Sequence, residues 1–266
     1  MKINILTLSW DGLHLLKKLK PGLEKNLSNF NYKWFIRDNG SKDGTGPEVK
    51  NWDNVELLEA GHNRASFSEG VNSLFDLAEP KDDDLILFLN NDIEFKEDQA
   101  INQMVDLMEK TKAAVVGCRL MFPGANKISH CGVILSPTHN SLPWHLKTHQ
   151  PCSKAETQDR YFQAVTAACM LTTGKAFRKA GKLDTNLRWS FEDISYCLTL
   201  SIDHKEKVAY CGSTEIEHGT SVSLNKNPVH KLNVKNNVSY FKKLWDNKVL
   251  IDEDLYLKDP NYNIIK

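Results

Sequence analysis

The chain has 266 residues, enough to bury a substantial core, and its 41% hydrophobic and 26% charged residues are typical of a globular protein rather than a disordered one. Lys plus Arg equal Asp plus Glu at 34 each, so the net charge gives no reason to expect nucleic acid or an anionic membrane as a partner. The six cysteines include no C-x-x-C pair, which argues against a zinc site or a disulfide framework and favours reduced thiols in the cytoplasm.

The first 110 residues alternate strand-like and helix-like segments, a βαβ pattern that predicts a mostly parallel sheet. Leucines recur at helical spacing over residues 12–27, but Pro21-Gly22 interrupts them, so two helical pieces are expected there. No apolar run approaches the roughly 18 residues that cross a bilayer. We read the N-terminus as a first strand rather than a signal peptide. Strands are predicted over residues 3–9, 32–37, 55–59 and 85–89, and helices over 67–77 and 99–110.

Beyond residue 112 the pattern changes. Residues 113–122 and 127–135 predict two strands joined by the turn 123–126, which makes a hairpin rather than another crossover. Residues 136–160 have no clear period, and so long an irregular segment is usually functional or mobile. The remaining predicted elements are a strand over 164–172, a helix from Gly174, a helix after Ser190, a strand over 207–218, a helix over 229–245 and a polar surface tail.

The most informative stretch is LILFLNNDIE, residues 85–94, in which an apolar run stops abruptly at Asn90, Asn91 and Asp92. An apolar run of this length suits a strand buried on both faces of a sheet. Ligands of open α/β sheets bind beyond the carboxyl ends of the strands, and a carboxylate there suits a hard divalent cation. A polar turn in which Asp92 or Asn91 caps the next element is an equally good interpretation of this stretch alone.

Two further motifs carry acidic residues. In DNGSKDGT, residues 38–45, Asp38 follows a predicted strand, where it can accept from a ribose or base, although an Asx-rich turn explains the same residues. Glu192 and Asp193 follow Trp189-Ser190-Phe191, and a carboxylate there can remove a proton from a hydroxyl group. Ser190 as the cap of a helix with acids in its first turn is the structural alternative.

Histidines in the middle of the chain give weaker signals. His139, His145 and His149 are spaced by six and four residues in a segment without helical period, which makes a metal site there a weak interpretation. His130, in ISHCGV, is expected to be structural.

Five blocks in order resemble the signature of the GT-A glycosyltransferases of family 2, and within it the bacterial rhamnosyltransferase-like branch. The resemblance extends from residue 3 to about residue 221 and implies an α/β GT-A fold, with a Rossmann-like mostly parallel sheet and a mixed-strand acceptor-side half. It divides the chain into a nucleotide-sugar-binding half (1–112), a metal- and acceptor-binding half of the same domain (113–226), and a C-terminal helix and tail (227–266). The blocks are DNGSKDGT (38–45), NRASFSEGVN (63–72), LNND (89–92), GKLDTNLRWSFEDISYCL (181–198) and HGTS (218–221).

The resemblance also implies roles on the donor side. Asp38 would bind the uracil or thymine base of a UDP- or dTDP-sugar, with Asn39 beside it and Asn63 near the base or phosphates. Asn91 would support the donor as a neutral member of the metal-binding element.

Asp92 would coordinate the metal ion that bridges the donor diphosphate, and His218 would be its second protein ligand. A single carboxylate with one imidazole suits Mn²⁺ slightly better than Mg²⁺, although either ion remains open. Asp193, paired with Glu192, would be the general base that activates the acceptor hydroxyl.

On the acceptor side, Trp189, Trp144 and Tyr161 are candidate platforms for sugar rings, and all three are equally plausible as core residues. The family often has an Asp and an Arg where this chain has Ser195 and Thr199, so the identity of the acceptor is less certain than the donor chemistry.

The predicted function is therefore metal-dependent, inverting transfer of a sugar to a hydroxyl of a glycan or lipid-linked glycan, in polysaccharide biosynthesis. A nucleotidyltransferase is one alternative, although Ser9-Trp10-Asp11-Gly12 matches its Gly-rich loop poorly, and a catalytically inactive carbohydrate-binding protein is another. We expect a cytoplasmic location with at most peripheral contact at the inner face of a membrane, and no nucleic-acid partner. The sequence does not indicate an oligomeric state.

Overall fold

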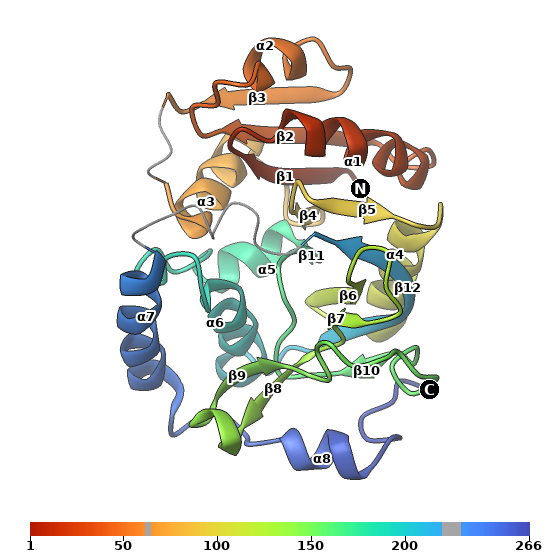
Figure 1. Cartoon of the computed structure of the whole chain (residues 1–266), viewed down its shortest axis with the longest axis vertical. Coiled ribbons are helices and arrows are strands. Elements are labelled where there is room, and N and C mark those ends of the chain that lie inside the picture. Colours follow the sequence, from red (N-terminus) through yellow and green to blue (C-terminus); the bar gives the residue numbers. More distant parts are fainter. Residues whose placement is uncertain (62–64, 220–229) are drawn as a thin grey trace.

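A ten-stranded sheet runs through the computed structural model, which describes residues 1–61, 65–219 and 230–266, with side chains from residue 235 onward in the last range. Its strands lie in the order β10-β12-β6-β11-β4-β1-β2-β3, with β5 paired to β12 and β7 to β6. Helices cover both faces of the sheet (Figure 1). Apolar residues of α1 and α4 form one buried cluster, and those of α3, α5, α6 and α7 form the other.

The parallel strands predicted in the N-terminal half are confirmed. β1 (Ile3–Ser9) pairs in parallel with both β2 (Tyr32–Asp38) and β4 (Leu85–Leu89), and β3 (Val55–Glu59) extends the sheet beyond β2. Every residue of β4 is buried, and its side chains alternate between the two apolar clusters. The polar residues that follow β1, β2 and β4 therefore come together at one edge of the sheet.

Residues 13–26 form one continuous helix, α1 (Leu13–Asn26), so the two pieces predicted around Pro21 are wrong. A proline inside a helix costs about 3 kcal/mol. The buried Leu16, Leu19 and Leu23 offset this cost, since burying each leucine contributes about 1.5–3 kcal/mol. Gly22 lets α1 approach β5 (Ile93–Phe95), because a Cβ at this position would lie 3.2 Å from Phe95 Cβ.

The other helices of this half are α2 (Thr45–Val49), α3 (Phe67–Ala78) and α4 (Ala100–Thr111). α3 begins with a capping box, in which the Ser66 hydroxyl accepts from the Glu69 amide and the Glu69 carboxylate accepts from the Ser66 amide.

In the second half, β6 (Val115–Met121) and β7 (Ile128–His130) are antiparallel, which confirms the hairpin, but the second predicted strand is shorter than expected. The chain turns at Gly132, whose φ is +110°, and β8 (Val133–Ser136) leaves the main sheet to pair with β9 (Leu142–His145). The segment expected to be irregular therefore contains a strand, together with the 3₁₀ turn Pro137–His139.

Two strands from late in the chain complete the sheet. β11 (Cys169–Thr173) inserts between β4 and β6 and is antiparallel to both, and the predicted strand from residue 164 begins only there. β12 (Val208–His218) lies parallel to β6, antiparallel to β5 and beside the short β10 (Arg160–Tyr161). β12 thereby brings His218 alongside Ile93.

The helices after β11 are α5 (Gly174–Lys179), α6 (Glu192–Leu198) with a π-helical turn at Thr199–Asp203, α7 (His230–Trp245) and α8 (Glu253–Lys258). The C-terminal segment is docked rather than a loose surface tail. Tyr256 is 4% exposed and stacks on Phe162 at 4.4 Å, and the buried Asp252 accepts a 2.8 Å hydrogen bond from the Leu135 amide.

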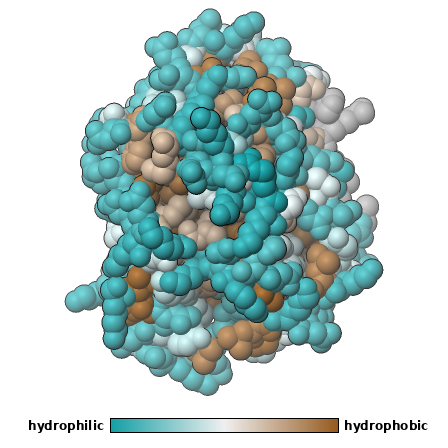
Figure 2. Space-filling view, turned by 180° about the vertical axis from the view of Figure 1, so that it is seen from behind, coloured by the Kyte–Doolittle hydropathy of each residue, from teal (hydrophilic) through white to brown (hydrophobic). Residues whose placement is uncertain are grey.

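The described part of the chain contains no helix long and apolar enough to cross a membrane. Seen from behind, the molecule presents a mainly hydrophilic surface with scattered apolar patches (Figure 2), as the composition predicts.

Candidate active site

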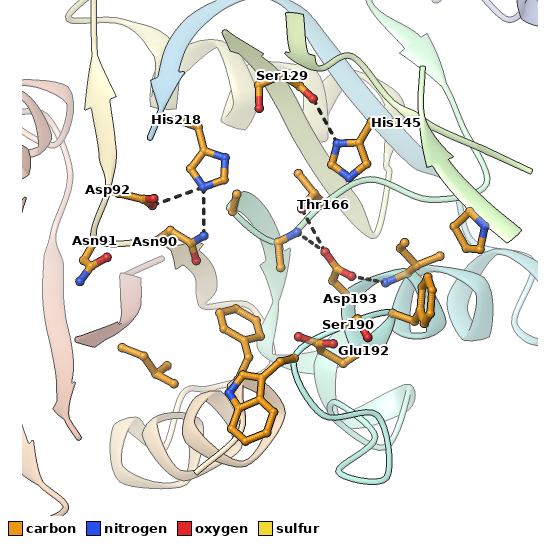
Figure 3. A pocket seen from close by; sticks show the side chains of 18 of the residues that line it. Asn90, Asn91, Asp92, Ser129, His145, Thr166, Ser190, Glu192, Asp193 and His218 are labelled. Atoms are coloured by element: carbon orange, nitrogen blue, oxygen red, sulfur yellow. Dashed lines mark hydrogen bonds and ion pairs between the residues drawn. The ribbon is translucent and has the colours of Figure 1, made fainter. Parts of the chain in front are cut away.

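A cleft of about 700 Å³ opens at the carboxyl ends of β1, β2 and β4. Residues of the N-terminal half line one wall, including Ser9, Asn39 and Asp92. The other wall is built from β9, the segment before β11 and the start of α6. The cleft brings together side chains that are far apart in the sequence (Figure 3).

Asp92 and His218 face each other where the end of β12 pairs with the start of β5. The Asp92 Oδ1 atom lies 3.3 Å from His218 Nε2, and the side chains are 10% and 14% exposed. The Gly219 amide donates to the Asp92 carbonyl at 3.0 Å, which fixes the end of β12 beside Asp92. The carboxylate and the imidazole thus lie close together, as the family resemblance implies.

The two asparagines before Asp92 point in different directions. The Asn90 side-chain amide lies 3.2 Å from His218 Nε2, and that of Asn91 donates to Ser9 Oγ at 3.2 Å. A Cβ on Gly12 would lie 2.5 Å from Asn91 Nδ2, so the loop after β1 packs directly against this side chain.

Asp38 is the last residue of β2, and Asn39 follows it directly. Asp38 is 6% exposed, and its Oδ1 accepts from the Ser41 amide at 3.0 Å and the Ser41 hydroxyl at 2.5 Å, so the Asx turn left open by the sequence is present. Asn39 lines the cleft, while its side-chain oxygen accepts from Arg37 Nε at 2.9 Å. Asn63 lies outside the described residues.

Asp193 stands on the opposite wall, in the first turn of α6. Its Oδ2 accepts from the Ala167 amide at 2.8 Å and the Thr166 hydroxyl at 3.1 Å, and its Oδ1 accepts from the Ile194 amide at 2.8 Å. These bonds hold the carboxylate in one orientation at the cleft surface. A carboxylate oxygen has two lone-pair sites, so Oδ2 is fully engaged by its two donors, whereas Oδ1 accepts one hydrogen bond from the described residues and keeps a second site for a ligand.

Glu192 also lines the cleft but is 6% exposed, and its Oε2 has no hydrogen-bond partner among the described residues. Burial, with the charge of Asp193 as a second cause, raises the pKa of the Glu192 carboxyl well above its usual value. Glu192 is therefore a carboxyl group that favours its neutral form.

Both predicted tryptophan platforms line the cleft, whereas the third predicted platform, Tyr161 on β10, does not. Trp144 is 45% exposed and stacks on His139 at 4.1 Å, and the Arg188 guanidinium lies 5.0 Å from the Trp189 ring centre. Trp144 is therefore not a core residue. A second stacked pair, Phe122 and His149 at 4.6 Å, adds an aromatic surface that the sequence did not single out.

The sequence interpretation did not assign Trp10, Thr166 or His145 to the site, although all three line the cleft. Trp10 lies in the loop after β1, and Thr166 holds Asp193. The signal for His145 is its place in LPWHL, where a polar residue that ends a short strand is available to a ligand. The weak metal interpretation of His139, His145 and His149 gains no support, because the described residues include no cluster of three potential metal-binding side chains.

The chemistry of Asp92 and His218 fits a divalent cation that shares its ligands with a diphosphate. The carboxylate offers the oxygen that Mg²⁺ and Mn²⁺ prefer, and Mn²⁺ also accepts imidazole. Asn90 can turn its side-chain amide to present an oxygen to the same position, because the two ends of an amide have nearly the same shape. With so few protein ligands, such an ion would need further oxygen ligands from a bound substrate and from water.

The chain is similar to known proteins over more than half of its length. Residues 16–154, just over half of the chain, match Glycosyl transferase family 2. The O-antigen biosynthesis protein RfbC of Myxococcus xanthus is 24% identical over 230 residues, covering 84% of this chain. The chain spans only 18% of the length of that relative.

Solved structures show the same fold. The mannosyltransferase PcManGT of Pyrobaculum calidifontis, in complex with GDP-Man and Mn²⁺, has a TM-score of 0.61 at 11% identity, covering 95% of this chain and 66% of that one. GalNAc-T7 with UDP, GalNAc and Mn²⁺ has a TM-score of 0.57 at 13% identity over 98% of this chain and 54% of that one. TarS of S. aureus (residues 1–349) scores 0.56 at 9% identity over 92% and 72%. The predicted GT-A fold is confirmed.

Proposed function

Because the chain belongs to glycosyl transferase family 2, we propose that it transfers a sugar from a nucleoside-diphosphate donor to a hydroxyl group of a glycan. The observation that carries this proposal is the arrangement of the cleft, with Asp92 and His218 on one wall and Asp193 on the other. A metal-binding pair on the donor side and a fixed carboxylate on the acceptor side are the two parts that such a transfer requires.

The donor is proposed to be a UDP- or dTDP-sugar. Asp38, Asn39 and Asn63 are assigned to its base and phosphates on the resemblance, and Asn39 also lines the cleft. Asp92 and His218 would hold Mn²⁺ or Mg²⁺, which supplies neutralisation of the charge that develops on the leaving diphosphate. Asn91 keeps the Ser9 loop against this element and supports it as a neutral group.

Asp193 is proposed as the general base. Its carboxylate accepts the proton of the acceptor hydroxyl while the hydroxyl oxygen forms a bond to the anomeric carbon. The bond from that carbon to the diphosphate oxygen breaks, and its electron pair leaves with the nucleoside diphosphate. Attack opposite the leaving group inverts the anomeric centre. Glu192, neutral and beside Asp193, keeps a second negative charge out of the base position.

The acceptor is proposed to be a glycan or lipid-linked glycan, with Trp144 and Trp189 packing against its sugar rings. The relative from Myxococcus xanthus is named for O-antigen biosynthesis, which supports a role in polysaccharide assembly. We place this activity in the cytoplasm, with peripheral contact at the inner face of a membrane when the acceptor carries a lipid.

Release of UDP or dTDP tests the donor half of the proposal. The purified chain is incubated with UDP-glucose, UDP-galactose, UDP-N-acetylglucosamine or dTDP-rhamnose, with and without Mn²⁺. We expect metal-dependent nucleotide release from one of these donors and a thermal shift with its nucleotide. If no donor gives nucleotide release and no nucleotide gives a thermal shift, the proposal that the chain is a glycosyltransferase is refuted.

Asp193→Asn tests the acceptor half. We expect loss of transfer by about 10²-fold or more, since general-base catalysis contributes 10²–10⁴-fold, with nucleotide affinity nearly unchanged. An asparagine must place its NH₂ group opposite one of the amides that now donate to the carboxylate, which can lower the stability of the variant. The melting temperature of the variant is therefore measured as well. The matched control is Asp106→Asn, on the exposed face of α4. Loss of nucleotide binding in Asp193→Asn would mean that the base is misplaced.

A further inference from the structure

His145 lies at the end of β9 and lines the cleft on the same side as Asp193 (Figure 3). Its Nδ1 is 3.2 Å from the Ser129 carbonyl oxygen. A carbonyl oxygen only accepts hydrogen bonds, so Nδ1 carries the ring proton and Nε2 presents a lone pair. In the described part of the chain, no hydrogen bond to Nε2 is present. Burial lowers the pKa of His145, which keeps the imidazole neutral.

His130 packs against this ring. The two imidazoles meet edge to face, with centres 4.8 Å apart and planes at 74°, and His130 is fully buried. Burial, with His145 as a second cause, lowers the pKa of His130 well below its usual value. A neutral, buried ring packed against His145 fixes its orientation without placing a positive charge beside it.

Thr166 connects this pair of histidines to the proposed base. Its amide lies 3.4 Å from His130 Nε2, and its hydroxyl donates to Asp193 Oδ2 at 3.1 Å. The positions of His145 and Asp193 are therefore set by the same short segment of chain. An unused lone pair is held at a fixed place near the carboxylate that takes a proton from the acceptor.

A fixed hydrogen-bond acceptor in a polar cleft selects a ligand that carries a donor at the matching position. Resting on the proposed glycosyl transfer, we propose that His145 Nε2 accepts a hydrogen bond from a second hydroxyl of the acceptor sugar, adjacent to the hydroxyl that Asp193 deprotonates. The acceptor is accordingly a sugar with two neighbouring free hydroxyls. His145 is an acceptor-binding residue and takes no part in holding the donor.

Two substitutions of His145 test the roles of its two ring nitrogens separately. His145→Asn retains a donor for the Ser129 carbonyl but removes the acceptor at the Nε2 position, whereas His145→Gln places an amide oxygen close to Nε2. The probes are octyl glycosides of glucose, galactose, mannose and rhamnose. We expect His145→Asn to raise the KM for the best glycoside about tenfold, the effect of one hydrogen bond. His145→Gln should stay within about threefold of wild type.

The donor side provides the internal control. The donor KM and the rate of donor hydrolysis to water should be unchanged in both variants. His14→Asn, exposed on α1, should behave as wild type in every assay. If His145→Asn melts below wild type, His145→Phe replaces it, because it keeps a ring against His130 and also lacks the acceptor atom.

Monodeoxy versions of the best glycoside identify the contact. Removing the hydroxyl next to the site of transfer should raise the KM of the wild type about tenfold but leave that of His145→Asn unchanged. The inference is overturned if the asparagine variant equals wild type, if it still loses affinity for the deoxy sugar, or if donor turns over without transfer to any glycoside. Absence of donor turnover refutes instead the proposed function on which the inference rests.

Discussion

Glu192 offers a direct test of the electrostatics of the cleft. Burial raises the pKa of its carboxyl in the folded chain, whereas the unfolded chain exposes it at its ordinary value. Between these two pKa values the folded protein holds a proton that the unfolded protein has lost, so the free energy of unfolding decreases as pH rises. Glu192→Gln removes this titration and leaves a neutral side chain of nearly the same shape.

The size of the effect follows from one proton. Over each pH unit in which the folded protein holds the proton and the unfolded protein does not, the wild type loses at most about 1.4 kcal/mol relative to the variant. Between pH 5 and pH 7 the difference in stability between the two proteins should therefore grow by up to about 2.7 kcal/mol. As the pH falls below 4.5, the ordinary pKa of the carboxyl, the unfolded chain also takes up the proton, and the difference should approach a constant value.

Urea unfolding followed by circular dichroism at pH 4, 5, 6 and 7 measures this difference, and other titrating groups cancel between the two proteins. A parallel pH dependence for wild type and Glu192→Gln would refute the argument, because it would mean that the folded chain leaves the Glu192 pKa unchanged. Glu109→Gln, exposed on α4, is the matched control and should follow the wild type at every pH.

Two glycines give further predictions. Gly12→Ala would place a Cβ 2.5 Å from Asn91 Nδ2, and we expect a rise in donor KM of about tenfold, equivalent to about 1.4 kcal/mol, measured by nucleotide release. An unchanged donor KM would contradict the support assigned to Asn91. Gly132→Ala would place a Cβ 2.3 Å from the Phe162 ring at a φ of +110°, and should lower the stability by about 2–4 kcal/mol. The control is Gly124→Ala, at a φ of +65° with nothing within 4 Å, which should lower the stability by only about 1 kcal/mol. Thermal melting followed by circular dichroism measures both variants.

The sheet edge of the N-terminal half was predictable because it depends on local patterns. Short apolar runs followed by polar residues gave β1, β2 and β4, and parallel pairing places Ser9 opposite Asp38. The carboxyl ends of these strands then meet by geometry alone. The approach of His218 to Asp92 could not be obtained in this way, since it depends on a strand from late in the chain. Only the family resemblance predicted it.

The misses have physical causes that lie outside any short window. Pro21 ends a helix by local preference, but the buried face of α1 carries the helix through it. The sequence did not predict β9, because this short strand pairs only with β8, in a small sheet separate from the main one. The polar composition of the C-terminal segment predicts exposure, whereas Asp252 and Tyr256 bind it to β8 and Phe162. Each outcome depends on tertiary partners that local propensity does not encode.

The insertion of β11 between β4 and β6 has a consequence for how the protein is made. Both neighbours emerge from the ribosome before β11, so each has an unpaired edge until Thr173 has been synthesised. Contacts between segments so far apart in the sequence are slow to form. Until β11 pairs with β4 and β6, their unpaired edges favour aggregation. We expect nascent chains that stop before β11 to require a chaperone, and the yield of recombinant protein to depend on the rate of translation through residues 122–168.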